Sequence, residues 1–218
     1  MRIRSYLLTG TLMVAASTST YGQNSNRPGD VQFRNDCRLA AQVLQSGQPA
    51  NKTAWASDMI GACPQEGAAV LAQLWVRPAL DSATVNQLLN ASVRIRDQRL
   101  ASAALAAARN TSNQETVRII AIGLLFLYAD PSGRLSFGEL VAPDGWVPGQ
   151  PVRMLPVGQS PHKIPQQDGD SPLPSEFAAE TALALRSLGD SDPNPRIQYV
   201  AIGLARRLEH RALGRAGH

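Results

Sequence analysis

Two stretches of the chain place apolar residues at helical spacing and share a common pattern. Residues 195–208, PRIQYVAIGLARRL, carry apolar side chains at i, i+3, i+4, i+7 and i+11, and residues 115–128, ETVRIIAIGLLFLY, repeat this spacing together with the letters AIGL. A period near 3.6 residues predicts two helices. Gly123 and Gly203 stand at the same place in both copies, where glycine costs about 1 kcal/mol relative to alanine. We therefore expect a neighbouring helix to approach closely at each glycine. Two unrelated buried helices with an accidental match are the alternative.

The same apolar spacing predicts six further helices, which are short and separated by turn residues. The eight expected helices cover residues 30–45, 52–63, 65–75, 83–93, 97–109, 113–128, 176–188 and 195–208. The expected N-cap residues are Asp81 or Ser82, Ser112 or Asn113, Ser175 and Asp192, with Pro64 and Pro193 at the first helical position. Short helices joined by tight turns pack as helical hairpins, so we expect about four hairpins.

Residues 131–174 interrupt this pattern with a long insertion rich in proline and glycine. The insertion exceeds ordinary loop lengths, but it holds more apolar residues than a disordered linker would. Asp144 and Gly145 between two apolar pairs predict a hairpin turn, and residues 152–157 predict another short strand. We expect the first half to lie in an ordered conformation on the helices and residues 159–172 to be mobile.

Composition favours one all-α domain over residues 30–218. Alanine supplies much of the apolar content, aromatic residues make up only 5%, and alanine-rich helices pack closely. The formal net charge is +4, and Arg2 and Arg4 contribute two of these charges in an expected leader. So small an excess does not indicate nucleic acid or an anionic membrane surface as a partner. The arginines near the C-terminus fit the negative end of a helix dipole.

The first residues have the pattern of an export signal. Residues 1–22 begin with Arg2 and Arg4, continue with an apolar run over residues 6–16, and end in small residues before Gln23. The run is too short to span a bilayer, so we expect cleavage, no membrane insertion, and a periplasmic or secreted protein. An uncleaved N-terminal anchor is the alternative. The polar residues 23–29 are expected to form a disordered leader.

Two cysteines lie on apolar faces of the first two expected helices. Cys37 shares a face with Ala40 and Leu44, and Cys63 shares one with Trp55 and Met59. If these helices form an antiparallel pair, both thiols point into the seam, and an oxidising compartment would join them. We predict a Cys37–Cys63 disulfide, and two buried free thiols are the alternative. Two cysteines without a nearby histidine do not form a zinc site.

Motifs for catalysis or cofactors are lacking in the sequence. There is no phosphate-binding glycine loop and no metalloprotease or serine-hydrolase motif. His162 stands near Ser160, but Pro161 between them opposes the hydrogen bond that nucleophilic catalysis needs. Asp168 and Asp170 lack the remaining ligands of a calcium loop and are interpreted as solvated acids. We therefore expect no enzyme activity, no cofactor and no metal site.

The second helix of each matching hairpin resembles a HEAT repeat. An acid or amide precedes the pattern V-R-x-x-A-x-x-L, which Asn113, Val117, Arg118, Ala121 and Leu124 carry in full. Asp192 and residues 197–204 carry it with Gln198 in place of the arginine. The resemblance to HEAT and armadillo proteins implies a right-handed α-α superhelix and a scaffold that binds proteins. The motif is structural and implies no catalytic residue.

The leading hypothesis is therefore an exported, non-catalytic scaffold that binds a protein or peptide. Apolar residues of the insertion are the candidate contacts, because exposed aromatic side chains on ordered loops often anchor interfaces. The candidates are Phe137, Leu140, Trp146 and Met154. They alternatively serve only to pin the insertion onto the helices. The rival function is an extracytoplasmic enzyme or enzyme accessory that uses residues 131–174 as an active-site lid, with His162 or the pair Asp168 and Asp170 as its chemical groups.

Overall fold

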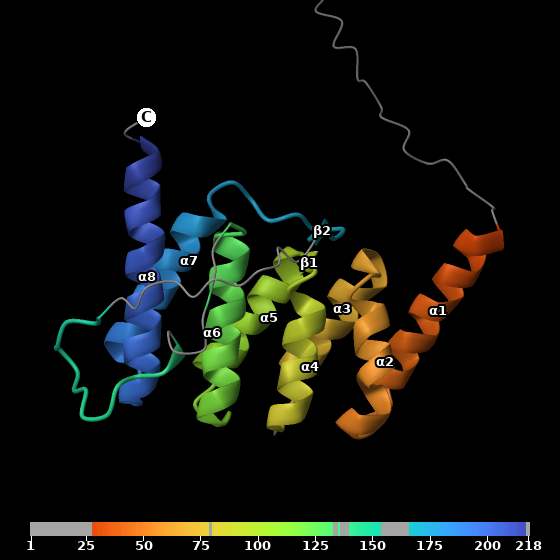
Figure 1. Ribbon diagram of the computed structural model, residues 1–218, viewed down its shortest axis with the longest axis horizontal. Helices are drawn as coiled ribbons and strands as arrows, with labels where there is room; N and C mark the ends of the chain where they lie inside the picture. Colours follow the sequence, from red (N-terminus) through yellow and green to blue (C-terminus); the bar gives the residue numbers. More distant parts are fainter. Residues whose placement is uncertain (1–27, 79, 133–134, 136–139, 154–165, 217–218) are drawn as a thin grey trace, which may run out of the picture.

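A computed structural model describes residues 28–78, 80–132, 135, 140–153 and 166–216. Within these residues the chain forms eight helices, which confirms the predicted number (Figure 1). They are α1 (Pro28–Gln45), α2 (Ala50–Ile60), α3 (Pro64–Trp75), α4 (Ser82–Ser92), α5 (Gln98–Arg109), α6 (Glu115–Ala129), α7 (Phe177–Ser191) and α8 (Pro195–Ala216). α1 starts inside the expected leader, and α8 continues well past its predicted end at residue 208. The expected signal peptide lies outside the described residues.

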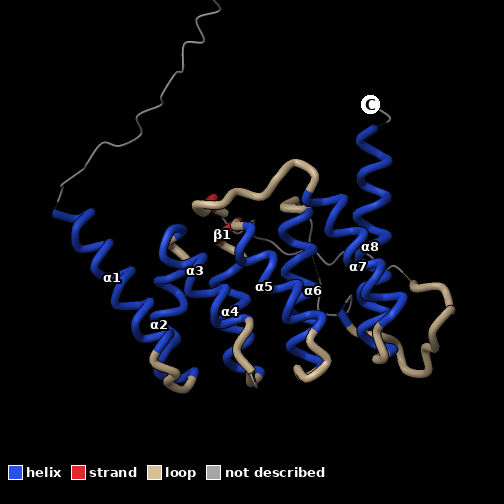
Figure 2. Tube along the Cα trace, turned by 180° about the vertical axis from the view of Figure 1, so that it is seen from behind, coloured by secondary structure: helices blue, strands red, loops and turns tan. Residues whose placement is uncertain are grey.

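The helices follow one another across the molecule in chain order (Figure 1). α1 packs on α3 and α3 on α5, while α2 packs on α4, α4 on α6 and α6 on α8. The molecule therefore has a layer of odd-numbered helices against a layer of even-numbered ones. Figure 2 shows the turns that join α1 to α2, α3 to α4, α5 to α6 and α7 to α8 along one side, which we name the turn edge.

The helix caps agree with the sequence only in part. Asp81 caps α4, because its Oδ1 accepts a hydrogen bond of 2.8 Å from the Thr84 backbone N–H, and Pro64 starts α3. The predicted caps of α6 and α7 are wrong: Gln114 and Glu176 hold these positions, and neither side chain makes a capping bond. α8 begins at Pro195, and its cap is the Asn194 side chain, which accepts from the Arg196 N–H at 2.9 Å. The predicted cap, Asp192, instead ends α7.

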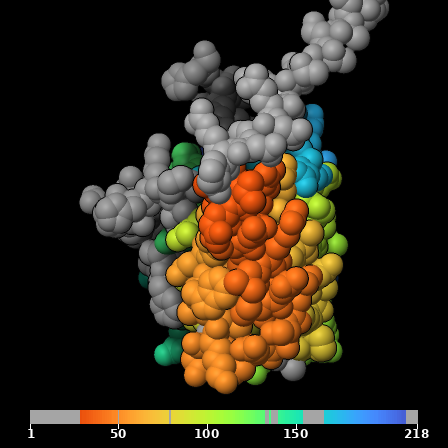
Figure 3. Space-filling model, turned by 90° about the vertical axis from the view of Figure 1, so that its right-hand side faces the viewer, coloured from red at the N-terminus to blue at the C-terminus, as the bar shows by residue number. Residues whose placement is uncertain are grey.

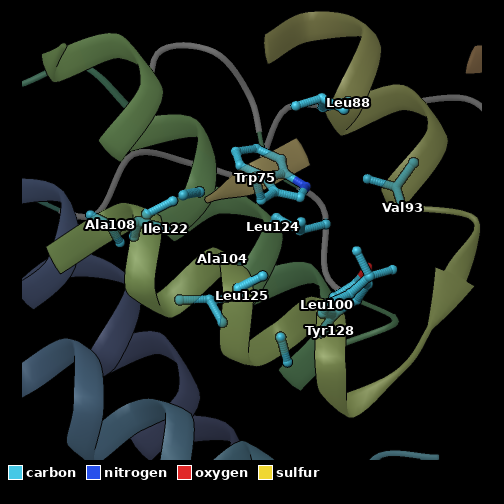
Figure 4. Close-up of a cluster of buried hydrophobic side chains, with 14 of the residues drawn as sticks. Trp75, Leu88, Val93, Leu100, Ala104, Ala108, Ile122, Leu124, Leu125 and Tyr128 are labelled. Carbon is cyan, nitrogen blue, oxygen red and sulfur yellow. The ribbon is translucent and has the colours of Figure 1, made fainter. Parts of the chain in front are cut away.

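The core is centred where α3, α4, α5 and α6 meet. Figure 4 shows Trp75 of α3 lying among side chains of α4 and α6. Its Nε1 donates to the Ser92 Oγ at 3.0 Å, and the Tyr128 hydroxyl donates to the Ser92 carbonyl at 2.7 Å. Both large side chains are fully buried, so these bonds satisfy groups that would otherwise destabilise the core. Ala104 and Ala108 of α5 are also fully buried, which fits close packing of α5 on α6.

The predicted disulfide is confirmed. Cys37 of α1 and Cys63, directly before α3, form an S–S bond of 2.10 Å, with 5.9 Å between their Cα atoms. Both residues are 1% exposed. α1 and α2 form the end of the molecule that faces the viewer in Figure 3, so the disulfide fastens the terminal helix to the body.

The insertion packs on the even-numbered layer at Gly123 and Gly203, where we expected a neighbouring helix. A Cβ on Gly123 would lie 3.5 Å from Leu135 and 3.6 Å from Leu140, and a Cβ on Gly203 would lie 3.1 Å from Val152. The expectation of a close helix at these glycines is therefore wrong, because the insertion occupies that side. Asp58 of α2 and Asn90 of α4 stand at the corresponding positions of their helices, and both are exposed.

Residues 140–153, which we name the excursion, form turns and no strand. The predicted turn is present, with Gly145 at φ 75° and a hydrogen bond of 3.2 Å from the Trp146 N–H to the Pro143 carbonyl. The hairpin is absent because residues on either side do not pair with each other. Residues 152 and 153 are not in a strand, and the remainder of the predicted strand over residues 152–157 lies outside the described residues.

The end of the insertion is ordered, which corrects the expected mobility of residues 166–172. β2 (Gln167–Asp168) pairs in parallel with β1 (Ile95–Arg96), with Ile95 opposite Gln167. The Gln98 N–H donates to the Ser171 carbonyl at 2.8 Å, and the fully buried Asp97 accepts from the Ser171 N–H at 3.1 Å. We name residues 166–171 the strap. The rest of the segment expected to be mobile, residues 159–165, lies outside the described residues.

Arginines near the C-terminus make specific contacts beyond the expected helix-dipole effect. The Arg207 guanidinium lies 4.6 Å from the centre of the Phe126 ring, and Arg211 pairs with the buried Asp130 at the end of α6. These contacts fasten α8 to α6 by cation–π and ionic attraction. No helix in the described part of the chain is long and apolar enough to cross a membrane.

Candidate functional site

A cleft of about 580 Å³ opens at the turn edge, between the α5–α6 turn with the start of α6, the start of α8 and the excursion. We name it the Trp146 cleft. A volume of this size is typical of ligand-binding clefts. It is lined by Thr111, Asn113, Glu115, Arg118, Ala142, Pro143, Asp144, Gly145, Trp146, Pro193, Asn194, Pro195 and Arg196.

Arg118, which lines this cleft, belongs to a buried ion pair with Asp192 behind the lining. The side chains of Arg118 and Asp192 are 4% and 2% exposed, and the Arg118 Nη1 donates to the Asp192 Oδ1 at 3.2 Å while a second bond joins Nη2 to Oδ2. The Arg118 Nε donates to the Ala108 carbonyl at 2.8 Å. One guanidinium thus joins α6 to the ends of α5 and α7. Because Arg118 is fully engaged, it holds the wall in place.

Glu115 forms a second, more exposed polar group at the start of α6. Its carboxylate accepts from the Asn194 Nδ2 at 2.8 Å and from the Arg196 Nη1 at 3.1 Å. The hydrogen bond from Asn194 lowers the pKa of Glu115, and the bond and charge of Arg196 add to this effect against the opposing effect of burial. Glu115 is therefore held as a carboxylate. The Arg196 side chain is 60% exposed and is therefore more accessible to a ligand than the Arg118 side chain, which is 4% exposed.

Trp146 packs against α8 on the excursion side of the cleft. Its ring meets Tyr199 edge to face, with 5.3 Å between ring centres and 76° between planes. The Tyr199 hydroxyl donates to the Arg153 carbonyl at 3.0 Å, which holds the excursion from its other end. The Trp146 Nε1 is buried and has no hydrogen-bond partner among the described residues. An unpaired buried donor disfavours this arrangement by about 1–3 kcal/mol, so the packing of the ring must outweigh it.

The structure places two of the four binding candidates. Leu140 lies against α6, and Trp146 lies against α8, and both are partly buried. Phe137 and Met154 lie outside the described residues. Val141 and Val147, which the sequence analysis did not single out, are the exposed apolar residues of the excursion, at 47% and 51%. Their positions next to the more buried Ala142 and Trp146 could have identified them as exposed, because neighbouring residues of a locally extended segment point to opposite sides.

A second cleft of about 280 Å³ lies between the first and second turns of the turn edge. We name it the Gln87 cleft. Thr53 and Ser57 of α2 are buried in it, and their hydroxyls donate to the Gln87 Oε1 at 3.0 Å and 3.4 Å. Gln48 lies at its rim and is exposed. Sequence reasoning missed this cleft because small polar residues within helices carry no recognisable motif.

The acidic catalytic candidates stand apart from the Trp146 cleft. Asp168 and Asp170 both lie in the strap, are exposed, and do not line the cleft. Asp170 lies 3.7 Å from Arg99 in an exposed ion pair. Ser160 and His162 lie outside the described residues. Among the described residues, no three histidine, cysteine or acidic side chains are grouped to hold a metal ion.

The Trp146 cleft has the chemistry of a binding site for an uncharged ligand. Its walls carry as many basic as acidic side chains: Arg118 and Arg196 balance Glu115 and Asp144. The indole and the prolines supply apolar surface, and the amides and hydroxyl supply hydrogen-bonding groups. Comparison of the chain with protein-family models, curated proteins and solved structures found no match.

Proposed function

We propose that this protein is an exported scaffold of the HEAT-like type that binds a protein or peptide in the Trp146 cleft. The observation that carries the proposal is the excursion, which is held on α6 and α8 and brings an indole to the cleft, with the exposed Val141 and Val147 on the same segment. Interfaces are typically anchored by aromatic side chains at such positions.

The repeat interpretation is supported by equivalent contacts in the two AIGL helices. Arg118 and Gln198 stand at the same position of the repeat, and each donates a side-chain hydrogen bond to a carbonyl at the end of the preceding helix. The acceptors are Ala108, at 2.8 Å, and Asp192, at 2.6 Å. Packing of each even-numbered helix on the next is also what a stacked array requires. The right-handed superhelix remains part of this proposal.

Export is supported by the pattern of residues 1–22 and by the disulfide. Disulfides persist in oxidising compartments outside the cytosol and are rare where thiols are kept reduced. The Cys37–Cys63 bond is therefore consistent with a periplasmic or secreted protein.

Site-specific crosslinking tests the binding site. A photoreactive amino acid at Val147, beside Trp146, should capture one discrete partner from the native cell envelope. Leu183 on α7 is the matched control, since it is also apolar and is 71% exposed. Equal labelling from both positions would show nonspecific contact and contradict the proposal.

A cleft-filling substitution tests the same site without disturbing the ring of Trp146. Thr111 is exposed and lines the cleft, so Thr111→Trp should block capture while the melting temperature stays nearly constant. Trp146→Ala is less clean, because the indole packs on Tyr199 and its loss would loosen the excursion. Capture that survives Thr111→Trp would place the interface elsewhere.

A further inference from the structure

We propose that the partner binds as an extended, uncharged polypeptide segment that spans both clefts along the turn edge. This inference rests on the proposed function and specifies the form and chemistry of its ligand. It arises from the repetition of one feature: a cleft between the turns of the first two helix pairs and another between those of the last two.

The spacing of the clefts fits one extended segment. Helices packed side by side are about 8–10 Å apart, so two steps along the array separate the clefts by about 20 Å. An extended chain advances about 3.3 Å per residue, so about six residues bridge this distance. A ligand of about 8–12 residues would then fill both clefts, whereas a small molecule would reach only one.

The surface near the clefts also suits a polypeptide. Val76, 57% exposed, follows α3 at the second turn, and Val141 and Val147 flank Trp146 on the excursion. These are three of the eight large apolar side chains that are most exposed in the described residues. Asn110 and Thr111, at the turn before the Trp146 cleft, are exposed and uncharged. Apolar contacts beside hydrogen-bonding groups match the side chains and backbone of an extended peptide.

The side chains that line the two clefts carry balanced charges, which does not favour a strongly charged ligand. The Gln87 cleft contains one basic and one acidic residue, Arg77 and Asp81, and the Trp146 cleft is also balanced. Arg77 donates to the Gln45 carbonyl, and Asp81 caps α4, so both already act within the fold. Neither cleft therefore offers the excess of one charge that would attract an acidic or basic segment. Binding should change little with ionic strength.

The test is a selection of phage-displayed random peptides of about 12 residues on the immobilised full chain. Affinities of the selected peptides are then measured for wild type, Thr111→Trp, Gln48→Trp and Ser187→Trp, at low and high salt. Thr111→Trp fills the Trp146 cleft and Gln48→Trp fills the Gln87 cleft. Ser187→Trp is the control at an exposed position of α7. We expect each block to weaken binding about tenfold or more, with no effect of Ser187→Trp and less than about a twofold effect of salt.

Other outcomes overturn the inference in distinguishable ways. Peptides that respond to Thr111→Trp but not to Gln48→Trp would contradict the two-cleft segment and leave the proposed function standing. A selection without any peptide that responds to Thr111→Trp would contradict both. Enrichment of charged peptides whose affinity falls steeply with salt would show electrostatic recognition and overturn the uncharged ligand.

Discussion

Burial decides how much each of the two ion pairs made by the arginines of the Trp146 cleft contributes to stability. Arg118 and Asp192 are almost wholly shielded from water, while Arg196 and Glu115 are 60% and 34% exposed. Removing one partner of a buried pair leaves an uncompensated charge in a medium that solvates it poorly. An exposed pair loses little because water replaces the missing partner.

Arg118→Met should therefore lower the free energy of unfolding by about 3–5 kcal/mol, measured by urea denaturation. Arg196→Met removes an exposed arginine from the same cleft and should cost less than about 1 kcal/mol. Adding Asp192→Asn to Arg118→Met should recover part of the loss, since it removes the stranded charge. Equal losses from the two single substitutions would contradict this assignment.

Sequence reasoning identified Arg118 by its motif but not what it binds. Its partner Asp192 is 74 residues away and was assigned as the cap of α8. Asn194 takes the cap instead, and local capping preferences do not separate two polar residues so close together. Gly123 and Gly203 were recognised as points of close approach, but spacing along a helix does not reveal whether a helix or a loop approaches.

Among the elements, α1 depends most on a covalent link. It lies at one end of the row of helices, and in the described part of the chain it packs mainly on α2 and α3. Val31 and Phe33, near its start, are 42% and 43% exposed, so its first turns add little burial. The disulfide restricts the unfolded chain by joining two cysteines that are 26 positions apart.

Cys37→Ala with Cys63→Ala should lower the free energy of unfolding by about 3 kcal/mol. Hydrogen exchange should accelerate most in α1, because neighbouring helices keep their other contacts. Wild type treated with a reductant is the matched control and should behave alike. Uniform acceleration over all helices would indicate that α1 does not open separately.

The strap is held by a carboxylate whose charge depends on pH. Burial alone would raise the pKa of Asp97, but hydrogen bonds from the Arg99 side chain, the Arg99 N–H and the Ser171 N–H outweigh it and lower the pKa. A lowered pKa stabilises the fold above the unfolded value of about 3.9, and that stability is lost as pH falls through the folded value.

We therefore expect the strap to stay bound from neutral pH down to about pH 4 and to loosen below it. Limited proteolysis with a protease that is active at both neutral and acidic pH should cut wild type near residues 166–171 only in the acidic range. Asp97→Asn should already be cut at neutral pH, because it loses the ion pair with Arg99. Cleavage of wild type that does not vary with pH would contradict this role of Asp97.

The elements themselves were largely predictable, and the strap was not. All eight helices follow from apolar periodicity, because each buries one face against its neighbours. In the strap only Gln167 and Asp168 pair with a strand, which itself has two residues. Segments this short show no alternation of apolar and polar residues that would predict a strand. Its Gly169 leaves no room for a Cβ beside the Asp97 carboxylate, a reason visible only once the two segments are together.

At the scale of the molecule, the insertion is part of the fold. Its residues contact α6 and α8 and pair with β1, which lies between α4 and α5, so it links the last helices to the middle of the chain. Replacing residues 131–173 with a glycine–serine linker should lower the free energy of unfolding by several kcal/mol, because buried apolar contacts of Leu140 and Val152 are lost. Chemical denaturation measures this loss. A variant as stable as wild type would show that the insertion is dispensable.

The strap changes how these stacked helices would be expected to unfold. A linear stack touches only adjacent units, so its ends fray and each unit adds its own share of stability. Here Asp97 meets Ser171, 74 residues later, and this contact closes a ring that includes α5, α6 and the insertion. Ring closure raises the contact order, which slows folding. The middle of the molecule is then a single cooperative block, and the α1–α2 end is left as the place where unfolding begins.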